Sequence, residues 1–188
     1  MITPRLEVIL NAARTLFERY GYRKTSMQDI AQAAGISRPT LYAAFADKEA
    51  VFSALVRSVT EQNEAATALV LARTSGIRDR LRAVLDIWIV ERYAATFAAS
   101  GSSDIVESAA ISAPEAMGVF WDVCSRRVSE VLEDIAEERY RSAVVRVLVA
   151  AARDFKATAQ SVADLSVSID TLVDVADQIT RQVRGAHA

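Results

Sequence analysis

Residues 25–52 read TSMQDIAQAAGISRPTLYAAFADKEAVF, and this stretch decides the fold. Ser26 is followed three positions later by Asp29, which is the spacing of a capping box at the start of a helix. The apolar positions that follow predict a short amphipathic helix. This helix ends at Gly35, because glycine adopts the positive φ of a helix C-cap without strain.

A second short helix and the start of a third follow in the same stretch. Ser37 is placed to cap the second helix, and Pro39 lies in its first turn, where no backbone donor is lost. Asp47 is placed to cap a longer helix that begins at Lys48 and meets no helix-breaking residue before Thr74. Two short helices joined by a glycine turn bury little surface by themselves. Their known use is to hold the second helix in the major groove of DNA.

The spacing of these residues resembles the DNA-binding head of the tetracycline-repressor (TetR) family of regulators. The resemblance covers roughly residues 8 to 55. It implies a homodimer that binds a double-stranded DNA operator, most often as a repressor, and that is released by a small-molecule effector. The residues that carry the resemblance are Thr25, Ser26, Ile30, Ala31, Ala34, Gly35, Ser37, Leu41, Tyr42, Phe45, Lys48 and Glu49.

Eight residues are candidates for contact with DNA. Arg38 is suited to a guanine or a phosphate, Thr40 to a base or a phosphate, and the Tyr42 hydroxyl to a phosphate. Helix N-termini, where free amides and the helix dipole favour anions, hold Thr25, Ser26 and Lys48. Taken singly, each could instead be a packing or a solvated residue, and only their joint spacing favours DNA binding. The eight are Thr25, Ser26, Arg38, Pro39, Thr40, Tyr42, Ala43 and Lys48.

Sequence readout by this surface is expected to rely on few side chains. Ala43 and Ala44 are both short, and members of the family usually carry a larger residue at the position of Ala44. We therefore expect readout to depend on Arg38, Thr40 and the shape of the DNA.

The composition of the chain favours an all-α protein. It has six Gly and three Pro among 188 residues, where about 22 would be average, and 52% of its residues are hydrophobic. Pro4 and Gly21 bound a first amphipathic helix, and further helices are expected near 77–98, 104–112, 115–137, 141–163 and 167–184. We divide the chain into a helix-turn-helix DNA-binding domain, residues 1–47, and a ligand-binding and dimerisation domain, residues 48–188.

The charge is unevenly distributed between these parts. The net charge is −2, but residues 1–50 hold seven Lys and Arg against five Asp and Glu, and the remainder holds fifteen against nineteen. A modestly basic head on an acidic body is compatible with a head that meets phosphates.

A dimer seam is expected near the C-terminus, because one head covers only half of a two-fold operator. Apolar residues there recur at steps of 4, 3, 4, 3 and 4, the spacing of helices packed at a shallow angle. A looser stripe precedes them, and the alternative is that both stripes only cover their own domain. The seam candidates are Leu148, Phe155, Leu165, Ile169, Leu172, Ala176, Ile179 and Val183.

A ligand pocket is expected among the large aromatic residues of the middle helices, which have small residues beside them. These aromatics are Trp88, Tyr93, Phe97, Phe120 and Trp121. The alternative is that they form ordinary core. Asp86 and Asp122 could meet a cationic ligand, but Arg82 and Arg126 lie four residues from them, so ion pairs are the simpler interpretation.

The remaining function classes are poorly supported. One cysteine and one histidine, Cys124 and His187, cannot form a metal cluster, so no metal or cofactor is expected. No catalytic motif occurs, which argues against an enzyme. Redox sensing would depend on Cys124 alone, and a buried structural cysteine is commoner. The lack of a signal peptide or spanning segment predicts a cytoplasmic protein. The main alternative is a helical ligand-binding or scaffold protein whose head does not bind DNA.

Overall fold

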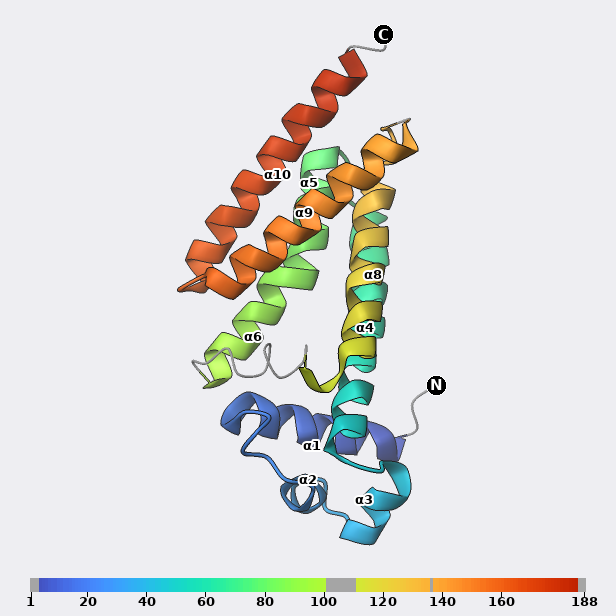
Figure 1. Ribbon diagram of the computed structural model, residues 1–188, viewed down its shortest axis with the longest axis vertical. Coiled ribbons are helices and arrows are strands. Elements are labelled where there is room, and N and C mark those ends of the chain that lie inside the picture. Colours follow the sequence, from blue (N-terminus) through green and yellow to red (C-terminus); the bar gives the residue numbers. More distant parts are fainter. Residues whose placement is uncertain (1–3, 101–110, 136, 186–188) are drawn as a thin grey trace. The chain divides into compact units, whose positions relative to one another are not determined.

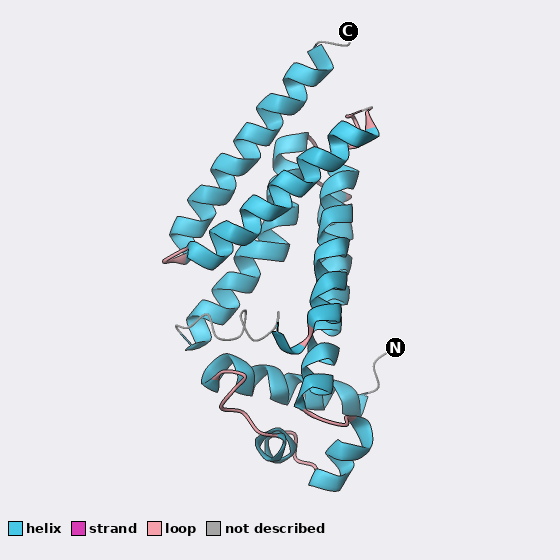
Figure 2. Cartoon of the chain, in the orientation of Figure 1, coloured by secondary structure: helices cyan, strands magenta, loops and turns pink. Residues whose placement is uncertain are grey.

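The structure is a computed structural model that describes residues 4–100, 111–135 and 137–185, and every regular element in these ranges is a helix (Figures 1 and 2). The prediction of an all-α fold is confirmed. The helix expected near 104–112 lies mostly outside the described residues. The elements are α1 (Pro4–Tyr20), α2 (Met27–Ala33), α3 (Arg38–Ala44), α4 (Lys48–Leu71), α5 (Ile77–Leu85), the π-helical segment η1 (Asp86–Val90), α6 (Glu91–Ser100), α8 (Pro114–Val131), α9 (Glu138–Thr158) and α10 (Val162–Gly185).

The chain forms two compact units. The first comprises residues 1–60 and 95–120, and the second comprises residues 61–94 and 121–188. The predicted head, residues 1–47, falls wholly within the first unit, while the domain boundary at residue 47 stays a prediction. Helix α4 contributes its first half to one unit and its second half to the other.

Local capping fixes the helices of the head as the sequence predicts. Gly35 has a φ of +65° in the turn between α2 and α3. The Ser37 hydroxyl accepts a hydrogen bond from the amide of Thr40 at 3.3 Å, and the Asp47 carboxylate accepts one from the amide of Ala50 at 2.7 Å. The end of α2 and the starts of α3 and α4 are thus fixed by residues at those positions.

An aromatic cluster holds α1 to the start of α4. The ring centroids of Phe17 and Phe52 are 5.3 Å apart in an edge-to-face arrangement, and Tyr22 packs on both rings. Ile30 and Leu41 are fully buried and join α2 and α3 to this core. The Tyr22 hydroxyl also hydrogen-bonds to Ser112, within the same unit.

In the second unit, α10 packs on α5 and α9. Trp88 is fully buried, and its indole nitrogen donates to the Thr67 hydroxyl at 2.8 Å. Trp88 belongs to η1, in which the apolar run Ile87 to Val90 is buried. Four consecutive residues of a helix point in different directions around its axis. Because all four are buried, other parts of the chain must enclose this segment on several sides.

Two helix ends differ from the sequence-based expectation. Helix α8 ends at Val131, earlier than expected, and the Arg141 guanidinium donates to the carbonyl oxygens of Glu133 and Ile135 beyond it. The junction between α9 and α10 lies at residues 159–161, and the Ser161 hydroxyl accepts a hydrogen bond from the amide of Asp164 at 3.0 Å. The end of α8 thus depends on a residue of the next helix, and the start of α10 depends on a serine cap.

Candidate nucleic-acid interface

Helix α3 has one buried and one open face. Leu41 is fully buried and anchors the helix, while Tyr42 beside it is 46% exposed. Thr40 is half-buried, and its hydroxyl oxygen lies 2.8 Å from that of Ser37. The open face carries Arg38, Pro39, Tyr42 and Ala43, as the sequence predicts.

Ser26 stands at the exposed start of α2 in the predicted capping box. Its backbone amide donates to the Asp29 carboxylate at 2.8 Å, and the amide of Asp29 donates to the Ser26 hydroxyl at 3.2 Å. Hydrogen bonds from the Ser26 side chain and backbone lower the pKa of Asp29. The Ser26 hydroxyl in turn donates to the Asp29 carboxylate at 2.7 Å, so its proton is used within the box.

Thr25 and Lys48 are placed differently from the exposed phosphate-binding groups that the sequence suggested. Thr25 is only 3% exposed, and its hydroxyl donates to the carbonyl oxygen of Gly21 at 2.9 Å. The Lys48 ammonium donates to the carbonyl oxygens of Tyr22 at 2.8 Å and Thr25 at 2.9 Å. Both polar groups are therefore used to close the loop between α1 and α2, because that loop has carbonyls which no helix satisfies.

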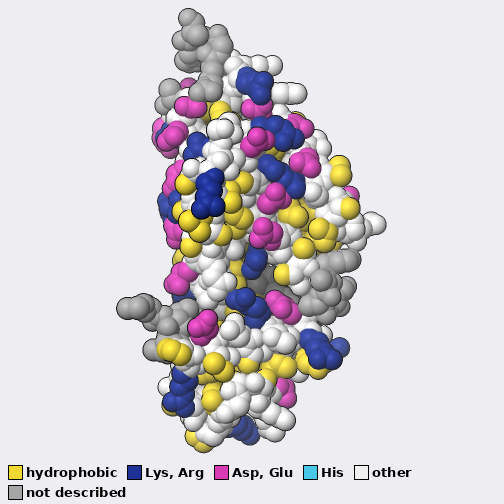
Figure 3. Space-filling view, turned by 180° about the vertical axis from the view of Figure 1, so that it is seen from behind, with side chains coloured by type: hydrophobic (Ala, Val, Ile, Leu, Met, Phe, Trp, Pro, Cys, Tyr) yellow, Lys and Arg dark blue, Asp and Glu magenta, His cyan; other side chains and the backbone are white. Residues whose placement is uncertain are grey.

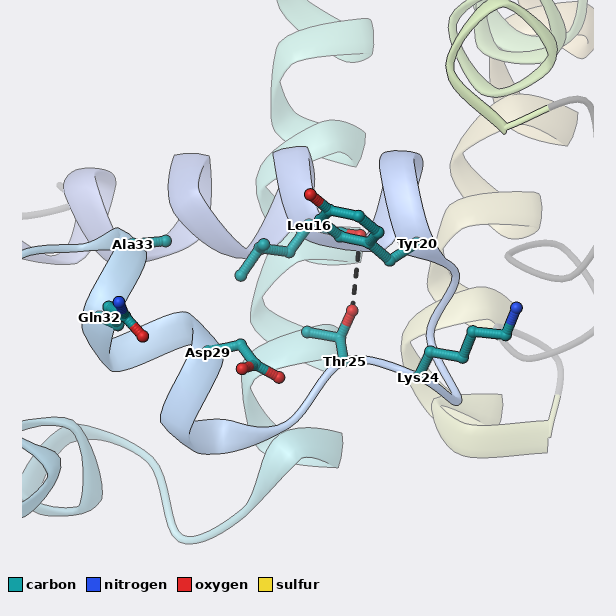
Figure 4. A pocket seen from close by; sticks show the side chains of 7 residues that line it. All are labelled: Leu16, Tyr20, Lys24, Thr25, Asp29, Gln32 and Ala33. Atoms are coloured by element: carbon teal, nitrogen blue, oxygen red, sulfur yellow. Dashed lines mark hydrogen bonds between the residues drawn. The ribbon is translucent and has the colours of Figure 1, made fainter.

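A groove of about 520 Å³ lies between α1 and α2 (Figure 4). Its walls mix the apolar Leu16 and Tyr20 with the oppositely charged Lys24 and Asp29. The Thr25 hydroxyl points toward the carbonyl oxygen of Leu16, 3.4 Å away. The groove is lined by Leu16, Tyr20, Lys24, Thr25, Asp29, Gln32 and Ala33. It is distinct from the aromatic region where the sequence placed a ligand.

The predicted ligand aromatics differ in burial and belong to both units. Trp88 is core of the second unit. Tyr93 and Trp121 are partly exposed in the same unit, where the Tyr93 hydroxyl donates to the carbonyl oxygen of Ala159 at 2.8 Å. Phe120 is buried in the first unit, and the side chain of Phe97 lies outside the described residues. Of the predicted aromatics, Tyr93 and Trp121 are thus the two with partly exposed side chains in the described part of the second unit.

The predicted seam residues divide by burial. Leu148, Leu165, Ile169 and Ala176 are buried within the chain itself, so they belong to its own core. Phe155, Leu172 and Ile179 are partly exposed, and the side chain of Val183 lies outside the described residues. The exposed large apolar residues of α9 and α10 in the described ranges are instead Tyr140, Val147, Val167 and Val175.

Cys124 and Lys156 interact electrostatically within the second unit. Cys124 is fully buried, and burial raises the pKa of its thiol to about 12. Burial, and then the nearby charge of Arg92, lower the pKa of Lys156 to about 8. Sequence reasoning did not single out Lys156, although it continues the buried stripe of Val145, Val149 and Ala152 along α9.

Acidic and basic side chains occur together on the surface of the protein (Figure 3). In Figure 3, basic and acidic side chains are interspersed over the visible face. Within the described ranges, no three His, Cys, Asp or Glu side chains come together as a metal site would require. None of the described helices is long and apolar enough to span a bilayer.

A capped helix-turn-helix unit whose second helix has an open face is the architecture of a DNA-binding head. Residues 9–55 match the family model described as bacterial regulatory proteins, tetR family. This match covers residues 9–55 of the 188, so it is the head of the chain that is similar to this family.

Relatives match the head of the chain in sequence and most of the chain in fold. The chain is 41% identical over 61 residues to the HTH-type transcriptional repressor Rv1474c of Mycobacterium tuberculosis, covering 32% of this chain and 33% of the relative. This sequence match thus spans a third of that repressor's length. The fold is similar to a TetR-family regulator from Rhodococcus (TM-score 0.72, 17% identity, covering 92% and 98% of the two chains). It is also similar to Thermus thermophilus FadR, a repressor in complex with lauroyl-CoA (TM-score 0.63, 18% identity, 90% and 92%).

Proposed function

We propose that this protein is a homodimeric transcriptional repressor that binds a DNA operator through α3 and is released from it by a small-molecule effector. The observation that carries the proposal is the open face of α3 on a buried anchor. Leu41 fixes the helix, and Arg38 and Tyr42 extend from it into solvent.

The eight candidate residues take different roles in this proposal. Arg38 reads a base edge or binds a phosphate, and the Tyr42 hydroxyl binds a phosphate. The Ser26 hydroxyl binds a phosphate only after leaving the Asp29 carboxylate, to which it donates in the free protein. Pro39, Thr40 and Ala43 supply close contacts along the groove. Thr25 and Lys48 keep the α1–α2 loop in the shape that presents Ser26, so their contribution to binding is positional.

Dimerisation follows from the two-fold geometry of operators, which requires two heads about one helical turn apart. Helices α9 and α10 support it, because they carry Val147, Val167 and Val175 exposed. Exposed apolar residues along neighbouring helices are typical of helix-mediated association. We place the seam on these valines together with Leu172 and Ile179.

Release by an effector requires the body to influence the head. Helix α4 is continuous from Lys48 to Leu71 and so runs from the head into the body. In the second unit, Glu64 of this helix forms ion pairs with Arg126 and Arg127 of α8. An effector that prefers one arrangement of the body would shift the population of head positions, by no more than its preference between the two states.

The decisive experiment is a titration of the purified dimer with DNA from upstream of its own gene at two salt concentrations. Operator binding should weaken steeply with salt and exceed binding to random DNA of equal length. Equal affinity for both DNAs, or none for either, would favour the alternative of a helical ligand-binding or scaffold protein.

A further inference from the structure

A buried side-chain amide on α4 lies in the second unit. Asn63 is 3% exposed, and its side-chain nitrogen Nδ2 is fully buried. No acceptor among the residues that the structure describes takes a hydrogen bond from this nitrogen. Buried amide groups are almost always paired, because an unpaired donor loses its bonds to water without replacement. The Asn63 side chain is therefore an exception that needs a physical reason.

The same local motif occurs on the exposed face of α1. The Thr15 hydroxyl donates to the backbone carbonyl oxygen of Asn11 at 3.0 Å, and the Thr67 hydroxyl donates to that of Asn63 at 2.7 Å. Asn11 and Thr15 are exposed, so water can satisfy the Asn11 side chain. Thr67 and Asn63 are buried. The motif thus accounts for the threonine hydroxyl and leaves the amide of Asn63 without an acceptor.

Two contacts define the surroundings of Asn63. The Thr67 hydroxyl accepts a hydrogen bond from the Trp88 indole nitrogen at 2.8 Å, which places η1 beside this part of α4. On the neighbouring side of α4, Glu64 accepts a hydrogen bond from Arg127 of α8 at 3.1 Å. Residues four apart share one face of a helix, so Asn63 is directed inward with Thr67, on the side of α4 that meets η1.

The geometry of η1 is a second, independent observation. Residues Asp86–Val90 are π-helical and lie between the α-helical segments α5 and α6. Single π-helical turns inside α-helices are rare and are frequently found at functional sites. Trp88 lies at the centre of this turn and is joined to the Asn63 face of α4 through Thr67. The rare helix geometry and the unpaired amide therefore belong to one neighbourhood.

We propose that the side-chain amide of Asn63 is the hydrogen-bond donor of a ligand site, and that it binds the carbonyl oxygen of a neutral, mainly apolar small molecule. An acceptor is required because the unpaired group is an N–H. A neutral molecule is favoured because a neutral amide repays little of the cost of burying a carboxylate. An apolar body suits the buried run Ile87 to Val90 of η1. The proposal rests on the proposed function only in treating this molecule as the effector.

Binding requires a local opening of the fold, because Asn63 has little exposed surface. The unpaired amide favours such an opening, since its N–H then gains a partner. A molecule that fills the opened space without an acceptor leaves the donor unpaired again. A carbonyl in the same position satisfies it, so this residue selects for a carbonyl over a hydrocarbon of the same shape.

The site can be observed directly, because Asn11 and Asn63 are the two asparagines of the chain. The full-length protein is labelled with ¹⁵N at its asparagine side chains, and Asn11→Ser assigns the two pairs of amide proton signals. Acetophenone should move the Asn63 signals downfield, as expected when a hydrogen bond forms, and should leave those of Asn11 in place. Ethylbenzene has the same shape without the oxygen and should give no downfield shift. Benzoate should bind more weakly than acetophenone.

A variant without the donor tests the selectivity. Calorimetry gives the affinities of acetophenone and ethylbenzene for the wild type and for Asn63→Leu. Comparing the ratio of these affinities between the two proteins cancels the different costs of removing the two molecules from water. The ratio should fall at least about fivefold in Asn63→Leu, the equivalent of one hydrogen bond. Asn63→Ala replaces it if the leucine variant does not fold, and Asn11→Leu is the matched control that should keep the wild-type ratio.

The proposal is overturned if acetophenone leaves the Asn63 signals unchanged, if ethylbenzene shifts them equally, or if benzoate binds more tightly than acetophenone. It is also overturned if the affinity ratio is the same in the wild type and in the Asn63 variants. Asn63 signals that are already downfield and unmoved by every probe would identify an internal water as the partner of the amide, and no ligand site.

Operator binding is then measured with and without acetophenone. A protein that binds acetophenone at Asn63 but no operator would retain this site and lose the proposed function. One that binds operator but not acetophenone would retain the function and lose the site.

Discussion

The ammonium nitrogen of Lys48 lies 2.8 Å from the carbonyl oxygen of Tyr22 and 4.2 Å from the centroid of that residue's ring. One cation thus satisfies backbone carbonyls in the α1–α2 loop and stacks on a ring of the aromatic core. At a helix start in a DNA-binding head, a lysine suggests a phosphate contact. Its partners here make it a structural residue of the head.

Replacing Lys48 by methionine should destabilise the protein by about 1–3 kcal/mol, because two carbonyls lose a charged donor. DNA affinity should fall with little change in the slope of log affinity against log salt concentration. A direct phosphate contact would instead reduce that slope by about one. Chemical denaturation and binding at several salt concentrations measure the two effects.

Lys24→Met is the control, because Lys24 is an exposed cation in the same loop. It should leave stability within about 0.5 kcal/mol of the wild type. A Lys48→Met protein of normal stability and reduced salt slope would contradict the structural role and restore the phosphate contact.

Arg38→Ala should weaken operator binding by about 1–3 kcal/mol, with unchanged stability since the side chain is exposed on α3. If Arg38 reads a guanine, the loss should be concentrated at one base pair. Competition among operators with single substitutions tests this. Arg5→Ala, an exposed arginine on α1, is the control, and an equal loss there would remove the special role of Arg38.

Much of the head was predictable because its signals are local. Ser26, Ser37 and Asp47 each act on an amide three residues away, and Gly35 acts through its own backbone. The same kind of signal was present and missed at Ser161 and Asp164, which start α10 earlier than the apolar spacing suggested.

The features that escaped prediction depend on residues distant in sequence. Lys48 bonds to Tyr22, 26 residues earlier, and the end of α8 is satisfied by Arg141 of the next helix. Periodicity shows that a face is apolar but not whether it meets its own chain or a partner. Leu165 and Ile169 therefore fitted a dimer seam equally well, although they are buried in their own domain.

A charge on the outer faces of α10 should separate the dimer. Val167 is 66% exposed, so Val167→Glu costs the folded subunit little but desolvates a carboxylate in any seam there. Combined with Val175→Glu, it should yield folded monomers in sedimentation velocity. Leu69→Glu alters an exposed apolar residue of α4 and should leave the dimer intact. If the double variant were still a folded dimer, the seam would not include this face of α10.

Cys124 should be inert in the native protein. Its thiol is fully buried, and burial raises its pKa to about 12, so the reactive thiolate is scarce at neutral pH. Iodoacetamide at pH 8 should label it only after denaturation, as mass spectrometry would show. Rapid labelling of the native protein, or a change in DNA binding after mild peroxide treatment, would instead favour redox sensing by Cys124.

Lys156→Met should stabilise the protein at pH 7, by up to about 3 kcal/mol, because burial and the nearby charge of Arg92 make the charged lysine costly in the folded state. The pKa of Lys156 falls from its ordinary 10.5 to about 8 on folding. Between these pH values the unfolded chain binds more protons than the native one, so the unfolding free energy of the wild type rises with pH relative to that of the variant.

Cys124 has the opposite effect above about pH 9, because its thiol ionises first in the unfolded chain, but this residue is present in both proteins. The comparison therefore uses the difference in unfolding free energy between wild type and variant from pH 7 to 9, measured by urea denaturation. A difference that is absent at pH 7, or constant with pH, would mean that Lys156 is already neutralised in the folded protein.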